Sequence, residues 1–159
     1  MPELRNVKTG TRLPPLSKVL SDIHTTLLYR RTLLLAQGMD REFEKYAGGP
    51  NVHTDDAAAR AAGLPGRIVS GFHCYALISQ TLSRFFGMGW IAGGKIAVKF
   101  IRPILTGETL TCGGVVKRIV ASDKPGERLA ELELWCKNPR GDITTTGTAT
   151  ARVAGSSEN

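Results

Sequence analysis

The chain has 159 residues, enough for one compact domain, and its 42% hydrophobic and 22% charged residues are ordinary for a globular protein. The formal net charge of +7 is spread along the chain without a block of like charges, so we expect no nucleic-acid partner and favour phosphate-bearing small molecules. No apolar run reaches the roughly 18 residues that a membrane span requires.

Cysteine and histidine spacing excludes several kinds of chemistry. Cys74, Cys112 and Cys136 lie too far apart for a paired motif, and the three histidines lack metal-ligand spacing, so we expect no metal and no cofactor. The first ten residues lack the apolar block of a secretory signal. Together these features predict a cytoplasmic protein.

The first third of the chain contains one weak strand and a helical region. Residues 11–20 carry two prolines, so they can form only an edge or opening strand. Residues 21–46 show apolar positions at helical intervals, with Gly38 as the expected break. Thr54 or Asp55 can cap a short helix over residues 56–62, which Gly63 ends.

A long helix and four strands follow. In residues 68–86 the apolar stripe runs through every third or fourth residue, namely Phe72, Tyr75, Ser79, Leu82 and Phe86. Alternating patterns predict strands over residues 95–101, 108–120, 129–137 and 144–153. We therefore expect an α+β fold, an antiparallel sheet wrapped around the helix at about 68–86, as a single domain over residues 1–154 with a disordered tail over 155–159.

Small residues on the last predicted strand bear on whether the chain forms a dimer. Gly147, Ala149 and Ala151 share one face of the strand over residues 144–153. A face of small side chains permits close approach of another element, so we expect a homodimer.

Most of the candidate site residues lie between residues 47 and 82. His53 follows a Gly-Gly-Pro-Asn turn, and a histidine can move a proton in either direction near neutral pH, although a structural role is equally open. Ser70 and Gly71 precede the long helix, where unpaired backbone N–H groups can hold a carbonyl oxygen; the alternative is a simple cap and tight packing. The hydroxyl of Ser79 can instead bond the carbonyl four residues back.

The combination of motifs resembles the MaoC-like acyl dehydratases and (R)-specific enoyl-CoA hydratases of the hotdog fold. The resemblance rests on Gly48, Pro50, Asn51, His53 and Asp55, then the segment 66–71 that opens a helix, then Phe100-Ile101-Arg102-Pro103 with Gly107-Glu108-Thr109-Leu110, and it covers roughly residues 16–153. It implies a dimer and a thioester substrate, acyl-CoA or acyl-carrier bound, whose acyl chain lies beside the central helix.

The resemblance also assigns roles by position. His53 and Asn51 match catalytic positions, Gly71 matches the backbone group that polarises the thioester carbonyl, and Ser70 and Ser79 fall near the substrate. Where the family has its catalytic Asp, this chain has Gly49, and the residue before His53 is not proline. Asp40, Glu42 or Glu44 could replace the lost acid.

Three functions compete on this evidence. The first is an enoyl-thioester hydratase or 3-hydroxyacyl-thioester dehydratase with His53 as general acid and base. The second is a protein that binds acyl thioesters without turning them over, or an inactive subunit of a heteromer, which the missing Asp favours. The third is a thioesterase, in which a water held by His53 attacks the carbonyl.

Overall fold

The computed structural model describes residues 4–22 and 50–155. Nearly all of the predicted helical region 21–46, and the predicted tail after residue 155, therefore lie outside the described residues. Among the residues that the structure describes, no helix is both long enough and apolar enough to cross a bilayer.

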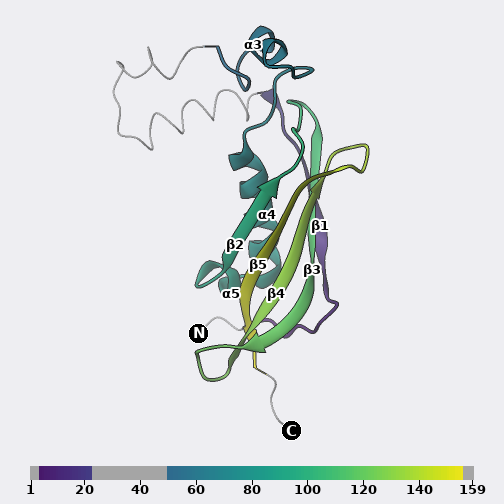
Figure 1. The fold of residues 1–159 in the computed structure, drawn as a ribbon. Helices are drawn as coiled ribbons and strands as arrows, with labels where there is room; N and C mark the ends of the chain where they lie inside the picture. The colour runs from purple at the N-terminus through teal and green to yellow at the C-terminus, as the bar shows by residue number, and fades with distance from the viewer. Residues whose placement is uncertain (1–3, 23–49, 156–159) are drawn as a thin grey trace, which may run out of the picture.

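A five-stranded antiparallel sheet curves around one long helix (Figure 1). The sheet order is β1-β3-β4-β5-β2, so β1 and β2 form its edges. The strands are β1 (Arg12–Val19), β2 (Lys95–Phe100), β3 (Thr109–Ala121), β4 (Glu127–Lys137) and β5 (Ile143–Ala154), and the helices are α3 (Asp56–Ala61), α4 (Gly71–Phe86) and α5 (Met88–Ile91). The predicted α+β fold is confirmed, and the four later strands begin and end within two residues of their predicted bounds.

Helix α4 begins later than its sequence pattern predicts. Ile68 forms a β-bridge with Leu105, and the Val69 N–H donates to the Ile104 carbonyl over 2.8 Å. Because residues 68 and 69 take part in this extended pairing, the helix starts only at Gly71, with Ser70 as its N-cap. The predicted start at residue 68 was therefore wrong by three residues.

The helix buries a face that overlaps the predicted apolar stripe only in part. Leu82 and Phe86 are buried as expected, but Phe72 is 70% exposed and Tyr75 is 42% exposed. The buried face runs instead through Cys74, Leu77, Ile78 and Thr81 before it reaches Leu82. The flank that carries Phe72 and Tyr75 lies beside edge strand β2, and no further strand in the described part of the chain covers it.

Strands β1 and β2 both have features that are typical of sheet edges. β1 pairs with β3 only, and the strand register shifts between Leu13 and Leu16 because Pro14 and Pro15 cannot donate to the ladder. The prediction of an edge strand in this region is confirmed. Within residues 4–22 and 50–155, the sole pairing partner of β2 is β5.

The small residues of β5 have an explanation within the chain itself. Ala149 and Ala151 are buried in the core beneath the helices, and Gly89 of α5 packs directly on the carbonyl oxygen of Arg152. These small side chains make room for helices of the same chain. The predicted dimer therefore gains no support from them and must rest on other surfaces.

Candidate functional site

His53 is held in a tight turn before α3. The Asn51 side-chain oxygen accepts from the His53 backbone N–H over 2.9 Å, and the backbone N–H groups of Thr54 and Asp55 donate to the Asn51 carbonyl. Asp55 then caps α3 by accepting from the Ala58 N–H over 2.7 Å. The predicted cap is confirmed at Asp55, and Asn51 fixes the backbone from which the His53 ring extends.

The His53 ring has a defined tautomer. Its Nδ1 lies 2.8 Å from the carbonyl oxygen of Ile68. A carbonyl oxygen can only accept a hydrogen bond, so Nδ1 carries the proton. In the neutral imidazole this leaves Nε2 with the lone pair, which is the arrangement that a general base requires.

Residues 67–69 join the His53 turn to the start of α4. The Ile68 N–H donates to the Val52 carbonyl over 3.0 Å, in addition to the contact between the Ile68 carbonyl and His53. On the other side, the Thr106 N–H donates to the Arg67 carbonyl over 3.0 Å. One extended segment is thus bonded both to the histidine turn and to the loop after β2.

Gly71 offers a backbone donor at the start of α4. Ser70 is 5% exposed, and its hydroxyl accepts from the Phe72 N–H over 3.4 Å, as the predicted N-cap does. The N–H of a first helical residue has no acceptor within the helix, and none of the described residues accepts from Gly71. This N–H is therefore available for a ligand, with the positive end of the helix dipole behind it.

One cavity brings His53 and Gly71 together. It measures about 380 Å³. Its lining comes from the His53 turn, the start of α4, the loop after β2 and one residue of β5, and consists of His53, Leu64, Ile68, Val69, Gly71, Cys74, Phe100, Ile101, Arg102, Pro103, Ile104 and Thr145. A polar acid-base group and a backbone donor thus share an otherwise largely apolar cavity, as small-molecule sites typically do.

Asn51 and Ser79, which were also predicted as site residues, lie elsewhere. Asn51 does not line this cavity, and Ser79 lies two turns along α4, where its hydroxyl accepts from Trp90 Nε1 over 3.2 Å. The bond to the carbonyl four residues back is made by Thr81, whose hydroxyl donates to Leu77. Asp40, Glu42 and Glu44 lie outside the described residues.

Several lining residues carried no site prediction. The sequence marks Phe100 and Arg102 only as part of a motif, and it marks Cys74 only as one of three cysteines without paired spacing. Thr145 is 1% exposed and belongs to a run of threonines in β5, so alternation alone does not indicate that this residue lines a cavity. Only the closure of the sheet around α4 brings these residues to the His53 turn.

Cys74 does not supply a nucleophile to this cavity. Burial and, to a smaller extent, neighbouring Cys136 raise the pKa of its thiol to about 12. The thiol therefore stays protonated near neutral pH, and a thiol is a much weaker nucleophile than a thiolate. Within the described ranges, 4–22 and 50–155, no group of side chains has the composition and geometry of a metal site.

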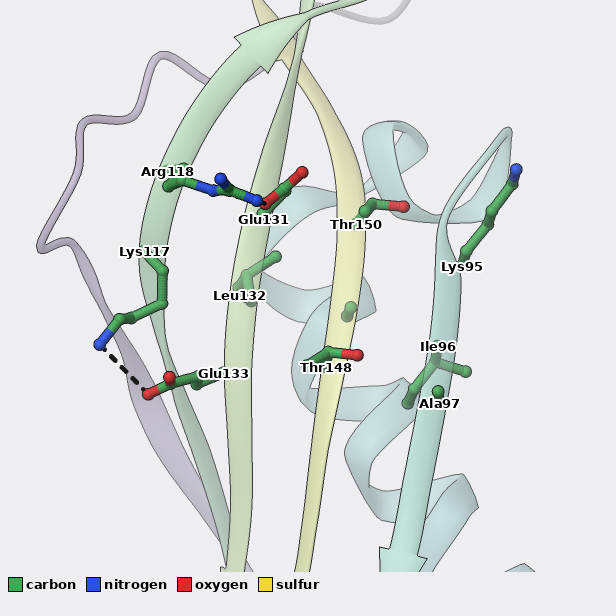
Figure 2. Close-up of a pocket in the computed structure, with 11 residues that line it drawn as sticks. Lys95, Ile96, Ala97, Lys117, Arg118, Glu131, Leu132, Glu133, Thr148 and Thr150 are labelled. Carbon is green, nitrogen blue, oxygen red and sulfur yellow. Dashed lines mark hydrogen bonds and ion pairs between the residues drawn. The ribbon is translucent and has the colours of Figure 1, made fainter.

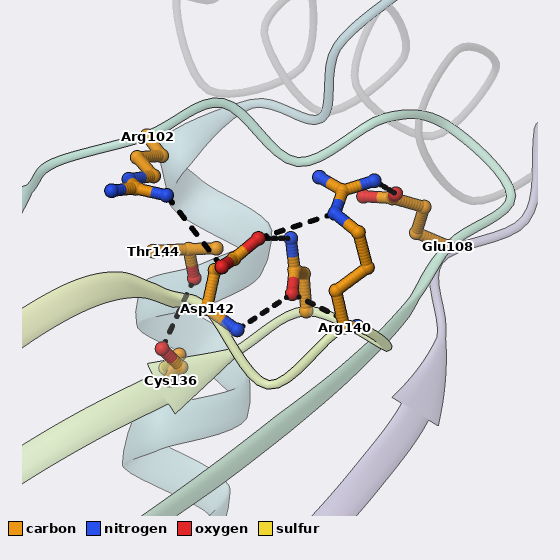
Figure 3. Close-up of polar contacts among 7 residues, drawn as sticks. Arg102, Glu108, Cys136, Arg140, Asp142 and Thr144 are labelled. Atoms are coloured by element: carbon orange, nitrogen blue, oxygen red, sulfur yellow. Dashed lines mark hydrogen bonds and ion pairs between the residues drawn. The ribbon is translucent and has the colours of Figure 1, made fainter.

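A polar network supports the rim of the cavity at Arg102 (Figure 3). Buried Asn138 donates through its amide to Asp142 over 3.0 Å and accepts from the Asp142 N–H over 2.9 Å. Asp142 in turn contacts the guanidinium groups of Arg140 over 3.2 Å and Arg102 over 3.6 Å. The β4–β5 turn thereby fixes a carboxylate against the arginine at the mouth.

A larger hollow, of about 560 Å³, lies on the outer face of the sheet (Figure 2). Two of its cations are paired with acids on the neighbouring strand, Lys117 with Glu133 over 3.3 Å and Arg118 with Glu131 over 2.5 Å. None of the predicted site residues that the structure describes lines it. Its size alone therefore does not make it the better candidate, because it lacks an acid-base group directed at an open donor.

Comparisons with known proteins agree with this fold. Residues 23–134 match the family described as MaoC like domain. No curated protein sequence gives a significant match. Many solved structures share the fold, which is the hotdog arrangement predicted above.

Three of these structures illustrate the range of sequence identity and TM-score. A MaoC-like dehydratase from Rhodospirillum rubrum is 19% identical with a TM-score of 0.68, and 93% of each chain is covered. An (R)-hydratase from A. caviae involved in PHA biosynthesis is 20% identical with a TM-score of 0.64, covering 92% of this chain and 97% of that one. The HadBC (3R-hydroxyacyl-ACP dehydratase) complex from Mycobacterium tuberculosis is 13% identical with a TM-score of 0.63, covering 94% and 99%.

The rim network predicts an acid-dependent loss of stability. Hydrogen bonds from Asn138 and Arg140 lower the pKa of the Asp142 carboxyl below its ordinary value of 3.8. A lowered folded-state pKa means that the carboxylate contributes stability above pH 3.8, and that this contribution disappears as the pH falls through the lowered value. The free energy of unfolding should therefore differ between the wild type and Asp142→Asn above pH 3.8, and this difference should shrink below it. Urea denaturation at a series of pH values measures it; a difference that stays constant across the series would contradict the assignment.

Proposed function

Because this chain belongs to the MaoC-like domain family, we propose that it hydrates enoyl thioesters, or dehydrates 3-hydroxyacyl thioesters in the reverse direction. The observation that carries the proposal is the single cavity lined by both His53 and Gly71. The hydratase and dehydratase named among the similar structures support the reaction class.

Each residue has a distinct task in the proposed reaction. His53 Nε2 takes a proton from a water molecule as its oxygen adds to the β-carbon of the enoyl group. The electrons of the double bond move toward the thioester carbonyl, whose oxygen gains negative charge. The Gly71 N–H and the helix dipole stabilise that charge, and the protonated His53 returns the proton to the α-carbon. The Ile68 carbonyl accepts from Nδ1 throughout, which holds the ring in position.

Phosphate groups on the carrier suit the charge of the protein. Acyl-CoA and acyl-carrier thioesters both carry anionic phosphates, and the net charge of +7 attracts them. Arg102 lies at the cavity mouth with its side chain 62% exposed. A cytoplasmic location, where thiols stay reduced, agrees with the three free cysteines.

The central test follows hydration and thiol release together. Mixing the protein with crotonyl-CoA should remove the enoyl absorbance without releasing free thiol. Release of thiol would instead identify a thioesterase, and binding without either change would identify a binding protein or an inactive subunit.

Substitution of His53 should abolish most of this activity. His53→Ala should lower kcat/KM for crotonyl-CoA by about 10²–10⁴-fold, the usual contribution of general acid-base catalysis. Arg118→Ala, on the outer face of the sheet, is the matched control and should retain wild-type kinetics. Full activity in a folded His53→Ala protein would reject every catalytic version of the proposal.

A carboxylate from residues 40–44 could replace the catalytic Asp of the family. The position of that acid holds Gly49, and Asp40, Glu42 and Glu44 lie shortly before it. We expect one of three separate alanine substitutions to reduce crotonyl-CoA hydration by about a hundredfold, since loss of one member of an acid-base pair has effects of this size. Unchanged hydration in all three variants would show that His53 works without a carboxylate from this segment.

A second copy of the chain fits the exposed flank beside β2. Phe72, Tyr75 and Phe100 are 70%, 42% and 51% exposed, and they line one apolar hollow next to an edge strand that has no outer neighbour among the described residues. Such a combination is typical of an interface. The HadBC structure is a complex by its name, so a different chain is the alternative partner.

Sedimentation velocity distinguishes these arrangements. The wild-type protein alone should sediment as a dimer, and Phe72→Glu should sediment as a monomer because it places a charge in the apolar interface. Val19→Glu, on the opposite edge of the sheet and 54% exposed, is the control and should remain dimeric. A wild type that is monomeric alone would contradict the homodimer and favour a different partner chain.

A further inference from the structure

Two cavities meet at the start of α4. The cavity that holds His53 measures about 380 Å³, and a second cavity of about 340 Å³ lies along the exposed flank of the helix. The second is lined by Ser70, Gly71, Phe72, Tyr75, Val98 and Phe100. Among the lining residues, Gly71 and Phe100 are the two that both cavities share.

Phe100 lines both cavities, and its ring lies against Gly71. A Cβ atom built on Gly71 would lie 2.8 Å from both Cε2 and Cζ of Phe100, well inside van der Waals contact. The ring therefore packs directly against the glycine that carries the open N–H. One aromatic ring thus stands between the donor for a thioester carbonyl and an apolar space beyond it.

The ring can be replaced or moved without opening the core. Phe100 is the last residue of edge strand β2 and is 51% exposed. The backbone beyond it is held separately, because the N–H groups of Ile101 and Arg102 both donate to the Thr144 carbonyl. Its side chain therefore sets the shape of the cavities rather than the stability of the sheet.

We infer that Phe100 is the residue that limits the length of the acyl chain. This inference rests on the proposed function, since it assumes a thioester whose carbonyl lies at Gly71. A short acyl chain ends against the ring within the His53 cavity. A longer chain needs the space between Tyr75 and Val98, which the ring closes off. A second copy docked on the flank would cover this space from solvent.

The size of the effect follows from the transfer of methylene groups out of water. Each buried methylene group strengthens binding by about fourfold, the ratio that corresponds to its usual transfer free energy. In the wild type this gain should stop once the chain reaches the ring. In Phe100→Ala it should continue over additional methylene groups.

The experiment measures dissociation constants of saturated acyl-CoA thioesters, from butyryl to dodecanoyl, by titration calorimetry. Affinity should level off at a shorter chain in the wild type than in Phe100→Ala. Val98→Ala is the matched control: it enlarges the second cavity but leaves the ring in place, so its levelling point should equal that of the wild type. Phe100→Leu keeps an apolar side chain on the edge strand and should shift the levelling point in the same direction, which provides the comparison if Phe100→Ala alters folding or assembly.

The outcomes separate this inference from the proposed reaction. Identical levelling points in the wild type and both Phe100 variants would overturn the inference, as would an equal shift in Val98→Ala or no binding of any acyl-CoA. Saturated thioesters cannot be hydrated, so the binding series is independent of turnover. If the levelling point shifts in the Phe100 variants but crotonyl-CoA is not hydrated, the proposed reaction is refuted and the role of Phe100 is supported. If crotonyl-CoA is hydrated but the levelling point does not shift, the reaction is supported and the role of Phe100 is refuted.

Discussion

Residues 67–69 hold the candidate site together. This short extended segment is bonded to the His53 turn through Ile68 and to the loop after β2 through Arg67 and Val69. It then runs directly into the N-cap of α4. Since these bonds fix three separate parts of the chain relative to one another, the distance between the histidine and the helix start depends on backbone pairing. The chemistry of the cavity follows from that constraint.

The same pairing decides the state of the histidine. An Nδ1–H bonded to a backbone carbonyl differs from one bonded to a carboxylate, because the carbonyl is neutral and stabilises an imidazolium ion less strongly. In the proposed reaction, His53 acts on the water through Nε2, and Asp40, Glu42 and Glu44 are the proposed sources of a second acid.

Much of the fold was predictable because its signals are local. Alternation marked β2 through β5, Asp55 marked the start of α3, and the paired prolines marked β1 as an edge. The start of α4 was not predictable, since Ile68 and Val69 continue the apolar pattern of a helix while pairing with residues some 35 positions later. The small residues of β5 have neighbours from elsewhere in the same chain, because Ala149 and Ala151 lie in the core with the helices and Gly147 lies against Ala97 and Val98 of β2.

The candidate site was likewise predictable from the sequence only in part. His53 and Gly71 could be proposed because each has a local signature, a loop histidine and a helix start. Ser79 could not be excluded, because only the position of α5 brings Trp90 to its hydroxyl. Phe100, Arg102 and Thr145 reach the cavity through the closure of the sheet, which no spacing along the chain encodes.

The proposed reaction requires the thioester carbonyl to lie at Gly71 with the acyl chain beside His53. A crystal structure with bound butyryl-CoA tests this most directly. The account predicts the carbonyl oxygen within about 3 Å of the Gly71 nitrogen, a normal hydrogen-bond distance, and the third acyl carbon facing His53 Nε2. A thioester bound in the hollow on the outer face of the sheet, or one whose carbonyl lies away from the start of α4, would contradict it.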